Sequence, residues 1–296
     1  DFGALVGEEA LAVALQPDGK IVAAGYSTSA NRVFAIARYD STGALDGGFG
    51  TGGLVTTAIG DGDATANAVA LQSDGNLVLA GSSVSGAKTN VTLARYISAT
   101  GVLDPDFGVG GVVTTAISAG SDIARGLAIQ PDGKIVVGGE ANGHFMVARY
   151  TITGTLDTDF GSGGFTTKQL SAEAGNAVAL QPDGKIILVG HTDLLGTDDF
   201  AVVRFTSAGT LDTSFNSING YVLTDFGSND LAQSVAIQPD GKIVVAGYTN
   251  AGGPNQFAAA RYNPNGTLDT SFGASGKLTV SFGALNDQAN AVAIQP

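Results

Sequence analysis

Apolar residues alternate with small and polar residues in short stretches along the whole chain, and one such pattern recurs five times. Each copy holds a strand of the type Ala-Val-Ala-Leu-Gln, a tight turn and a second apolar strand. Four copies turn through Pro-Asp-Gly-Lys and one through Ser73-Asp74-Gly75-Asn76. Proline presets φ at the first corner of a type I turn, Asp tolerates the second corner, and Gly takes the left-handed position that closes the turn. The pattern therefore predicts five β-hairpins, at residues 12–22, 68–78, 127–136, 177–187 and 235–244.

The hairpins belong to a longer repeat. The turn glycines are separated by 56, 58, 51 and 57 residues, a period typical of repeat architectures. Each repeat adds two short stretches that are β-branched or alternating and bounded by turn residues, which predicts a third and a fourth strand. The third strands end in Arg-Tyr or Arg-Phe, at residues 39, 96, 150, 205 and 262. The fourth strands are predicted at residues 54–59, 112–117, 165–169, 221–226 and 277–282, and no amphipathic helix is predicted.

Four antiparallel strands per repeat, with small residues in the first strand, are typical of a β-propeller blade, because blades crowd near the axis and only small side chains fit there. A linear solenoid would have a shorter rung and no tight hairpin. We therefore predict an all-β fold, a β-propeller of four-stranded antiparallel blades that forms a single domain over residues 1–296. The complete blades are expected at about residues 10–59, 66–117, 124–169, 175–226 and 232–282.

The two ends of the chain predict part of a sixth blade. Residues 1–3 match the end of a fourth strand at residues 225–227, and residues 290–296 match a first strand up to its turn. The sequence thus indicates an excerpt of a longer polypeptide whose ring has six blades, with five blades as the alternative. Because an open strand edge recruits other strands, self-assembly through the incomplete blade is expected if the parent chain does not fill it.

The repeat resembles a known family. The stretch Ala-Val-Ala-Leu-Gln-Pro-Asp-Gly-Lys-Ile-Val, then Ala-Arg-Tyr, then Gly-Thr-Leu-Asp-Thr-Ser-Phe-Gly, is similar to the delta-60 repeat family of β-propellers in large secreted bacterial proteins. The likeness to NHL-type propeller repeats is more distant. The resemblance covers nearly the whole chain and implies a propeller that is extracellular or on the bacterial cell surface. It implies no chemistry, because the family has no assigned molecular function.

Composition and charge limit the classes of partner that the protein is expected to bind. Acidic residues outnumber Lys and Arg by 27 to 14, and the net charge of −13 argues against nucleic acid, whose phosphates need clustered bases. No apolar run approaches the roughly 18 residues of a membrane-spanning helix, so no membrane insertion is expected. The absence of cysteine excludes disulfides, thiolate metal sites and cysteine nucleophiles.

Charged residues at repeated positions are interpreted as scaffold. One arginine closes each third strand, and one aspartate follows in the loop to the fourth strand. A ring of charged ligands is the alternative, but each Arg is expected to pair with a loop Asp or carbonyl, because a buried charge needs a partner. The residues concerned are Arg38, Arg95, Arg149, Arg204 and Arg261, with Asp46, Asp104, Asp157, Asp212 and Asp269.

Function is sought where the repeats differ. In an up-and-down blade, the loop between the second and third strands lies at the same end as the link to the next blade, and both are variable here. Residues just after the second-strand glycine, and others near the start of the first strand, are expected to open toward the central channel as a site for a polar or sugar-like ligand. Solvated loop ends are the alternative. The predicted ligand-binding residues are Tyr26, Asn67, Arg125, Glu140, Asn176, His191, Gln233 and Tyr248.

The sequence also contains weak signals for a metal site and for an enzyme. Asp61-Gly62-Asp63 resembles an oxygen-rich calcium loop, as do Asp193, Asp198 and Asp199, but neither stretch has EF-hand spacing and a solvated acidic loop is the alternative. No other cofactor is expected. The chain has two histidines and no Gly-x-Ser-x-Gly motif, so an enzyme would depend on Glu140 and His191 acting as an acid-base pair from adjacent blades.

The sequence therefore predicts a secreted or cell-surface bacterial β-propeller that acts as a binding, adhesion or structural module. A glycan or a surface protein is the expected partner. The alternative is a glycan-active hydrolase or lyase that uses the variable loops.

Overall fold

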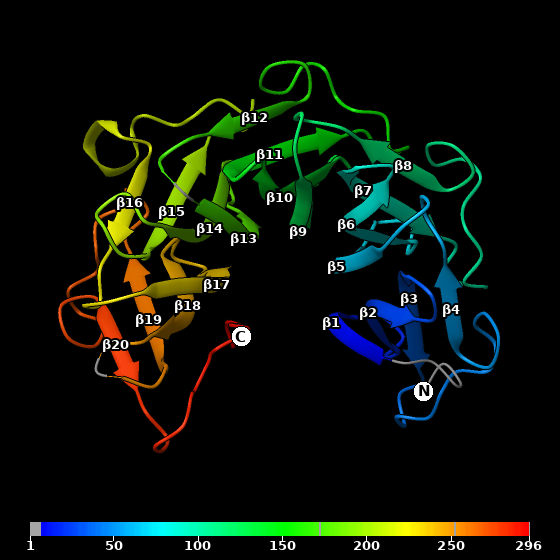
Figure 1. Ribbon diagram of the computed structural model, residues 1–296, viewed down its shortest axis with the longest axis horizontal. Coiled ribbons are helices and arrows are strands. Elements are labelled where there is room, and N and C mark those ends of the chain that lie inside the picture. The colour runs from blue at the N-terminus through cyan, green and yellow to red at the C-terminus, as the bar shows by residue number, and fades with distance from the viewer. Residues whose placement is uncertain (1–6, 172, 252, 296) are drawn as a thin grey trace. The chain divides into compact units, whose positions relative to one another are not determined.

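The computed structural model describes residues 7–171, 173–251 and 253–295, which form five four-stranded antiparallel sheets. In every sheet the strands follow one another in chain order, so each sheet is one sequence repeat (Figure 1). This confirms the predicted all-β propeller fold with one blade per repeat. The first two sheets consist of β1 (Gly7–Leu15), β2 (Ile21–Thr28), β3 (Arg32–Tyr39) and β4 (Leu54–Thr57), then β5 (Ala64–Leu71), β6 (Leu77–Ser85), β7 (Lys88–Tyr96) and β8 (Val112–Thr115).

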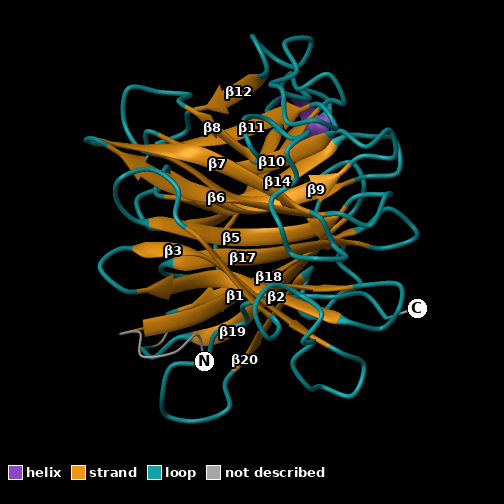
Figure 2. Ribbon diagram, turned by 90° about the vertical axis from the view of Figure 1, so that its right-hand side faces the viewer, coloured by secondary structure: helices purple, strands orange, loops and turns teal. Residues whose placement is uncertain are grey.

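The other three sheets repeat this order, and among the described residues the chain adds only one short 3-10 helix, η1 (Phe215–Ile218) (Figure 2). The third sheet consists of β9 (Asp122–Ile129), β10 (Ile135–Ala141), β11 (His144–Tyr150) and β12 (Phe165–Lys168). The fourth and fifth consist of β13 (Glu173–Leu180), β14 (Ile186–Thr192), β15 (Asp199–Phe205) and β16 (Tyr221–Thr224), then β17 (Asp230–Ile237), β18 (Ile243–Thr249), β19 (Gln256–Tyr262) and β20 (Lys277–Val280).

The strands differ from the predicted ranges mainly at their ends. Every first strand begins earlier than expected, as at Gly7 instead of residue 10, and every fourth strand stops after four residues. The hairpin turns agree with the prediction, because the five turn glycines have φ between +80° and +85°, a conformation that favours glycine. Residues 1–3 of the expected sixth blade lie outside the described residues, and residues 290–295 form no strand.

Contacts divide the chain into two compact units, residues 1–137 with 149–157 and residues 138–148 with 158–296. In the first unit, Val22, Phe34 and Ile36 of the first sheet share a core with Leu79 and Tyr96 of the second. Alternate residues of a strand face opposite sides of the sheet, so the second sheet offers one face to the first sheet and the other to the first strand of the third.

The second unit is built in the same way. Val189 and Val202 of the fourth sheet share a core with Val245 and Tyr262 of the fifth. A buried tyrosine at the end of a third strand marks these contacts, since the Tyr262 hydroxyl and Thr224 Oγ1 of the preceding sheet lie 2.7 Å apart. The same pairing joins Tyr96 to Thr57 and Tyr150 to Thr115.

The first sheet leaves its other face exposed. Val13 and Leu15 on β1 are 69% and 68% exposed, whereas Val69 and Leu71 at the equivalent places of β5 are partly buried against the core. The expected self-assembly through an incomplete blade remains a prediction.

Candidate functional site

Each sheet has two ends with different chemistry. We call the end with the first hairpin turn and the loop from the third to the fourth strand the turn end. The other, the variable end, holds the loop from the second to the third strand and the link to the next sheet.

Charged side chains at the turn end are paired with one another. Arg149 Nε lies 2.7 Å from Asp157 Oδ2, and Lys134 Nζ of the hairpin turn lies 3.0 Å from the same oxygen. The equivalent arginine and aspartate are 2.8 or 2.9 Å apart in the other four sheets, at Arg38–Asp46, Arg95–Asp104, Arg204–Asp212 and Arg261–Asp269. This confirms the predicted Arg–Asp pairs.

The same arginines also hold successive sheets together. Arg95 Nη1 donates a hydrogen bond to the main-chain oxygen of Ile152 at 2.6 Å, and its guanidinium lies 5.0 Å from the centre of the Phe107 ring. Arg38 and Arg204 donate to main-chain oxygens of the next sheet as well, at Ser98 and Pro264. These contacts give the repeated arginines a structural role, because a buried guanidinium needs several acceptors.

The pKa values of the loop aspartates reflect this pairing. Burial alone would raise the pKa of Asp212, but hydrogen bonds from Ser214 and the charges of Arg204 and Lys185 outweigh it and hold that pKa below its ordinary value. A hydrogen bond from the Ser271 hydroxyl is the largest of the effects that lower the pKa of Asp269. These carboxylates are therefore ionised and engaged.

A β-bulge places the predicted ligand-binding residues of the first strands. The register between the first and second strands shifts at one residue in each of four sheets, and this residue is Leu11, Asn67, Asn176 or Gln233. A glycine of the second strand lies opposite each bulge. At Gly190 an added Cβ would lie 1.8 Å from the main-chain oxygen of Ala174, so no side chain fits there. A bulge redirects a side chain out of the normal alternation of the strand.

Two of the bulge residues reach the next sheet. Asn67 Nδ2 donates to the main-chain oxygen of Ala124 at 2.8 Å, which places it beside Arg125. Asn176 Nδ2 donates to the oxygen of Ala232, also at 2.8 Å, beside Gln233. These bonds hold the two asparagines to the strands that carry Arg125 and Gln233, and they are structural bonds that the sequence did not indicate.

The remaining predicted residues occupy the position just after the second-strand glycine. The Tyr26 hydroxyl donates to Glu9 Oε2 at 2.8 Å, and this bond is the main reason why the pKa of Tyr26 is raised. The Arg32 guanidinium lies 4.2 Å from the centre of the Tyr26 ring, and Tyr26 and Glu9 line a cavity of about 160 Å³.

Glu140, His191 and Tyr248 lie at the same position of β10, β14 and β18, and all three are half-buried. Burial, together with the charge of Asp198, raises the pKa of Tyr248. The third, fourth and fifth sheets therefore contribute a carboxylate, an imidazole and a phenol at this point, and the first sheet has a tyrosine like the fifth.

The predicted calcium ligands Asp61 and Asp63 each accept a hydrogen bond from a different segment of the chain. Asp61 Oδ1 accepts a hydrogen bond from the main-chain N–H of Gly86 at 2.9 Å, and Asp63 Oδ1 accepts one from Arg32 N at 2.8 Å. Both side chains belong to exposed residues. They are not part of the acidic cluster that the structure forms elsewhere.

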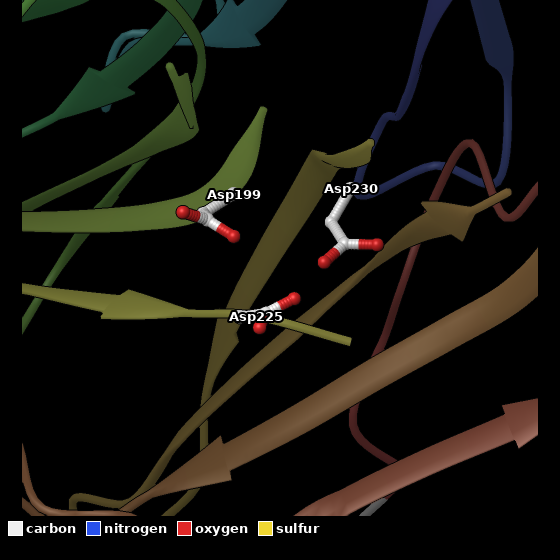
Figure 3. A group of neighbouring side chains, drawn as sticks. All are labelled: Asp199, Asp225 and Asp230. Carbon is white, nitrogen blue, oxygen red and sulfur yellow. The ribbon is translucent and has the colours of Figure 1, made fainter. Parts of the chain in front are cut away.

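That cluster consists of Asp199, Asp225 and Asp230, whose carboxylates face one another at the variable end (Figure 3). Asp199 begins β15, Asp225 directly follows β16, and Asp230 begins β17 of the next sheet. One carboxylate oxygen of each residue lies within 4.8 Å of the others. Asp199 and Asp230 are buried and Asp225 is exposed.

The two buried carboxylates differ from those of the turn end, where every repeated aspartate lies 2.7–2.9 Å from an arginine nitrogen. Neither oxygen of Asp199, and only one oxygen of Asp230, has a hydrogen-bond partner among the residues that the structure describes. Burial, with the neighbouring charges of Asp225, Asp230 and Asp198, raises the pKa of Asp199 to about 6. Burial also raises the pKa of Asp230.

Sequence reasoning noted Asp199 but missed its partners. Asp225 and Asp230 are 26 and 31 residues further along the chain, and only the packing of the fifth sheet on the fourth brings Asp230 to Asp199. A signal existed in the repeat, because an acidic residue also begins β9 and β13, at Asp122 and Glu173.

Comparisons with known proteins agree with the fold. The model of the family described as "Domain of unknown function (DUF5122) beta-propeller" matches five segments that together make up more than half of the chain, residues 16–49, 72–107, 130–160, 181–215 and 238–272. None of the curated proteins compared with the chain matches it.

Solved structures are similar at low sequence identity, which shows the fold alone. A protein from Lactobacillus plantarum is 16% identical with a TM-score of 0.54, over 90% of this chain and 71% of that one. Sqt1 from Chaetomium thermophilum is 16% identical with a TM-score of 0.50, over 97% of this chain and 64% of that one. A protein of unknown function from Bacteroides caccae is 12% identical with a TM-score of 0.47, over 93% and 87% of the two chains.

Proposed function

The chain belongs to the DUF5122 beta-propeller family, and from this premise we propose that it is a non-catalytic binding or adhesion module that is secreted or held at a bacterial cell surface. We further propose that a polar ligand of the glycan type, or a protein that displays one, binds at the variable end.

One observation carries this proposal. At the variable end the third, fourth and fifth sheets carry three different side chains at one equivalent position, Glu140, His191 and Tyr248, and each is half-buried. The charged side chains that repeat from sheet to sheet are instead engaged at the turn end. Aromatic rings and polar groups that are neither buried nor fully solvated are typical of sites for polar ligands.

The histidine chemistry supports a non-catalytic role. His144 Nδ1 lies 3.3 Å from Glu173 Oε1, and the Glu173 carboxylate also accepts the N–H groups of Leu170 and Ser171. This carboxylate holds the turn that precedes β13. A hydrolase or lyase would need Glu140 and His191 to share one substrate.

A glycan array probed with the labelled chain tests the proposal. We expect binding to a subset of glycans, and we expect Gln233→Ala and Tyr248→Ala to reduce it at least tenfold. Val109→Ser is the matched control, because Val109 is 88% exposed in a turn-end loop and its replacement should leave binding unchanged.

Two outcomes would contradict the proposal. Equal binding by all three variants would exclude the variable end as the site. Cleavage of a bound glycan, lost in both Glu140→Gln and His191→Asn, would show the enzymatic alternative instead.

A further inference from the structure

Successive sheets meet at equivalent positions of the variable end, which allows their chemistry to be compared. Where the third sheet meets the fourth, His144 at the start of β11 lies 3.3 Å from Glu173 at the start of β13. Where the fourth meets the fifth, Asp199 at the start of β15 faces Asp230 at the start of β17. A histidine can balance a carboxylate, whereas a second carboxylate adds to its charge.

The residues equivalent to Asp199 in the second and fifth sheets are neutral amides. The register pairs Ser83 with Asn90 and Thr249 with Gln256, as it pairs Thr192 with Asp199. An aspartate at this position is therefore not required by the sheet. Its presence beside another carboxylate needs a separate reason.

Burial makes the arrangement unfavourable as it stands. Asp199 is 1% exposed and Asp230 is fully buried. Both oxygens of Asp199 and Oδ1 of Asp230 have no hydrogen-bond partner within the described parts of the chain. Buried charges are normally paired or bound to a metal ion, because they have lost their hydration.

Lys277 lies near the cluster but does not replace that lost hydration. Lys277 Nζ donates to the main-chain oxygen of Asp225 at 2.8 Å and lies 5.4 Å from the centre of the Phe226 ring. One exposed ammonium thus stands near three clustered carboxylates and the neighbouring Asp198.

We propose that Asp199, Asp225 and Asp230 bind one calcium ion. Calcium binds oxygen ligands at about 2.3–2.6 Å, so two oxygens on one ion can be up to about 5 Å apart, and the oxygens here lie within 4.8 Å of one another. Three carboxylates provide up to six oxygens, and exposed Asp225 leaves room for water to complete the shell. The ion would bridge the start of β15 to the start of β17 and so join the fourth sheet to the fifth.

The test is calcium binding by the whole chain after removal of bound metal with EGTA. Isothermal titration with calcium chloride should give one ion per chain, and thermal melting followed by circular dichroism should show a midpoint that rises and saturates with calcium. At a calcium concentration 100 times Kd, the folded state gains about 100-fold over the unfolded state. Magnesium should bind more weakly, because it demands a tighter octahedral shell.

Two variants and one control locate the site. Asp199→Asn and Asp230→Asn should each weaken calcium binding at least tenfold, and Asp199→Asn should melt at a higher temperature than the unmodified chain in EGTA because the repulsion is relieved. Asp122→Asn is the matched control. Asp122 begins the first strand of the third sheet, and its carboxylate accepts the N–H groups of Ile117 and Ser118.

Three results would overturn the proposal. One is a melting midpoint that does not respond to calcium up to about 10 mM, above the range of weak extracellular calcium sites. The second is unchanged calcium affinity in both Asp199→Asn and Asp230→Asn. The third is a loss of calcium affinity in Asp122→Asn as large as that in the two site variants. None of these readouts depends on glycan binding, so failure here and failure of the proposed function are distinguishable.

Discussion

The turn ends and the variable ends of the same sheets solve the problem of buried charge differently. At the turn ends each repeated aspartate meets an arginine, and a lysine of the hairpin turn often joins the pair. At the variable ends the acid that begins a first strand meets histidine in one place and two further aspartates in another. At the turn ends each repeated aspartate lies at ion-pair distance from an arginine, even where one of its oxygens makes no hydrogen bond, as at Asp46 and Asp212. Asp199 has neither a hydrogen bond nor an ion pair among the described residues.

This difference indicates which residues serve the scaffold. A position that must be the same in every repeat is occupied by groups that satisfy one another, because every sheet packs on the next through the same contacts. A position that changes from repeat to repeat is free to carry chemistry that the packing does not need.

Gly190→Ala should cause the largest loss, although it lies at the variable end. The added Cβ would meet the main-chain oxygen of Ala174 at 1.8 Å, so β13 or β14 must move and the bulge at Asn176 must rearrange. We expect a loss of about 4 kcal/mol or more in the free energy of unfolding, at the upper end of single substitutions. Urea denaturation followed by circular dichroism measures it.

Gly47→Ala is its control. A Cβ at Gly47 meets nothing within 4 Å, and its replacement should change the free energy of unfolding by less than about 0.5 kcal/mol. If the two variants unfolded alike, the bulge would not be a fixed part of the blade.

Asp157→Ala should lower the free energy of unfolding somewhat less than Gly190→Ala does. It leaves the Arg149 guanidinium and the Lys134 ammonium without their shared carboxylate, and breaking a buried ion pair costs about 3–5 kcal/mol. Asp269→Ala removes the same contact from the fifth sheet, where the Arg261 side chain is 21% exposed, so the loss there should be smaller.

Both variants should keep any ligand binding at the variable end. Denaturant unfolding and the glycan array measure the two properties separately. A wild-type free energy of unfolding in Asp157→Ala would show that the Arg–Asp pairs are not part of the scaffold.

The smallest expected effect is that of pH on the stability of the fold. The two ends should respond to pH in opposite directions. The folded chain raises the pKa of Asp199 to about 6, above the value of about 3.9 in unfolded chains, so between these values the folded state binds more protons and stability rises as the pH falls. The pKa of Asp212 and that of Asp269 are lowered, so their contribution is lost as the pH falls below about 4.

In calcium-free buffer the melting midpoint should therefore rise from pH 7 toward about pH 5 and fall below about pH 4. Asp199→Asn should abolish the rise and leave the acidic fall. A midpoint that decreased steadily from pH 7 downward would contradict the opposite behaviour of the two ends.

The repeat, the four strands of each blade and the Arg–Asp pairing at the turn end could all be predicted from the amino-acid sequence. These depend on local patterns, because alternation, turn residues and a charge that recurs with its partner a few residues away can be seen in the chain. The sequence also pointed to Gln233 and Asn176 as unusual positions, although not to the bulge that sets them apart.

Which carboxylates meet depends on the packing of the sheets and could not be predicted from the sequence. Asp199 and Asp230 belong to different repeats, and the packing of one sheet on the next sets their distance. The paired acids at Asp61 and Asp63 looked more like a metal site in the sequence, yet they bind separate main-chain amides. Asp61 and Asp63 lie in a loop in which each is bonded by a different segment, whereas residues 31 positions apart were brought together because equivalent ends of neighbouring blades pack side by side.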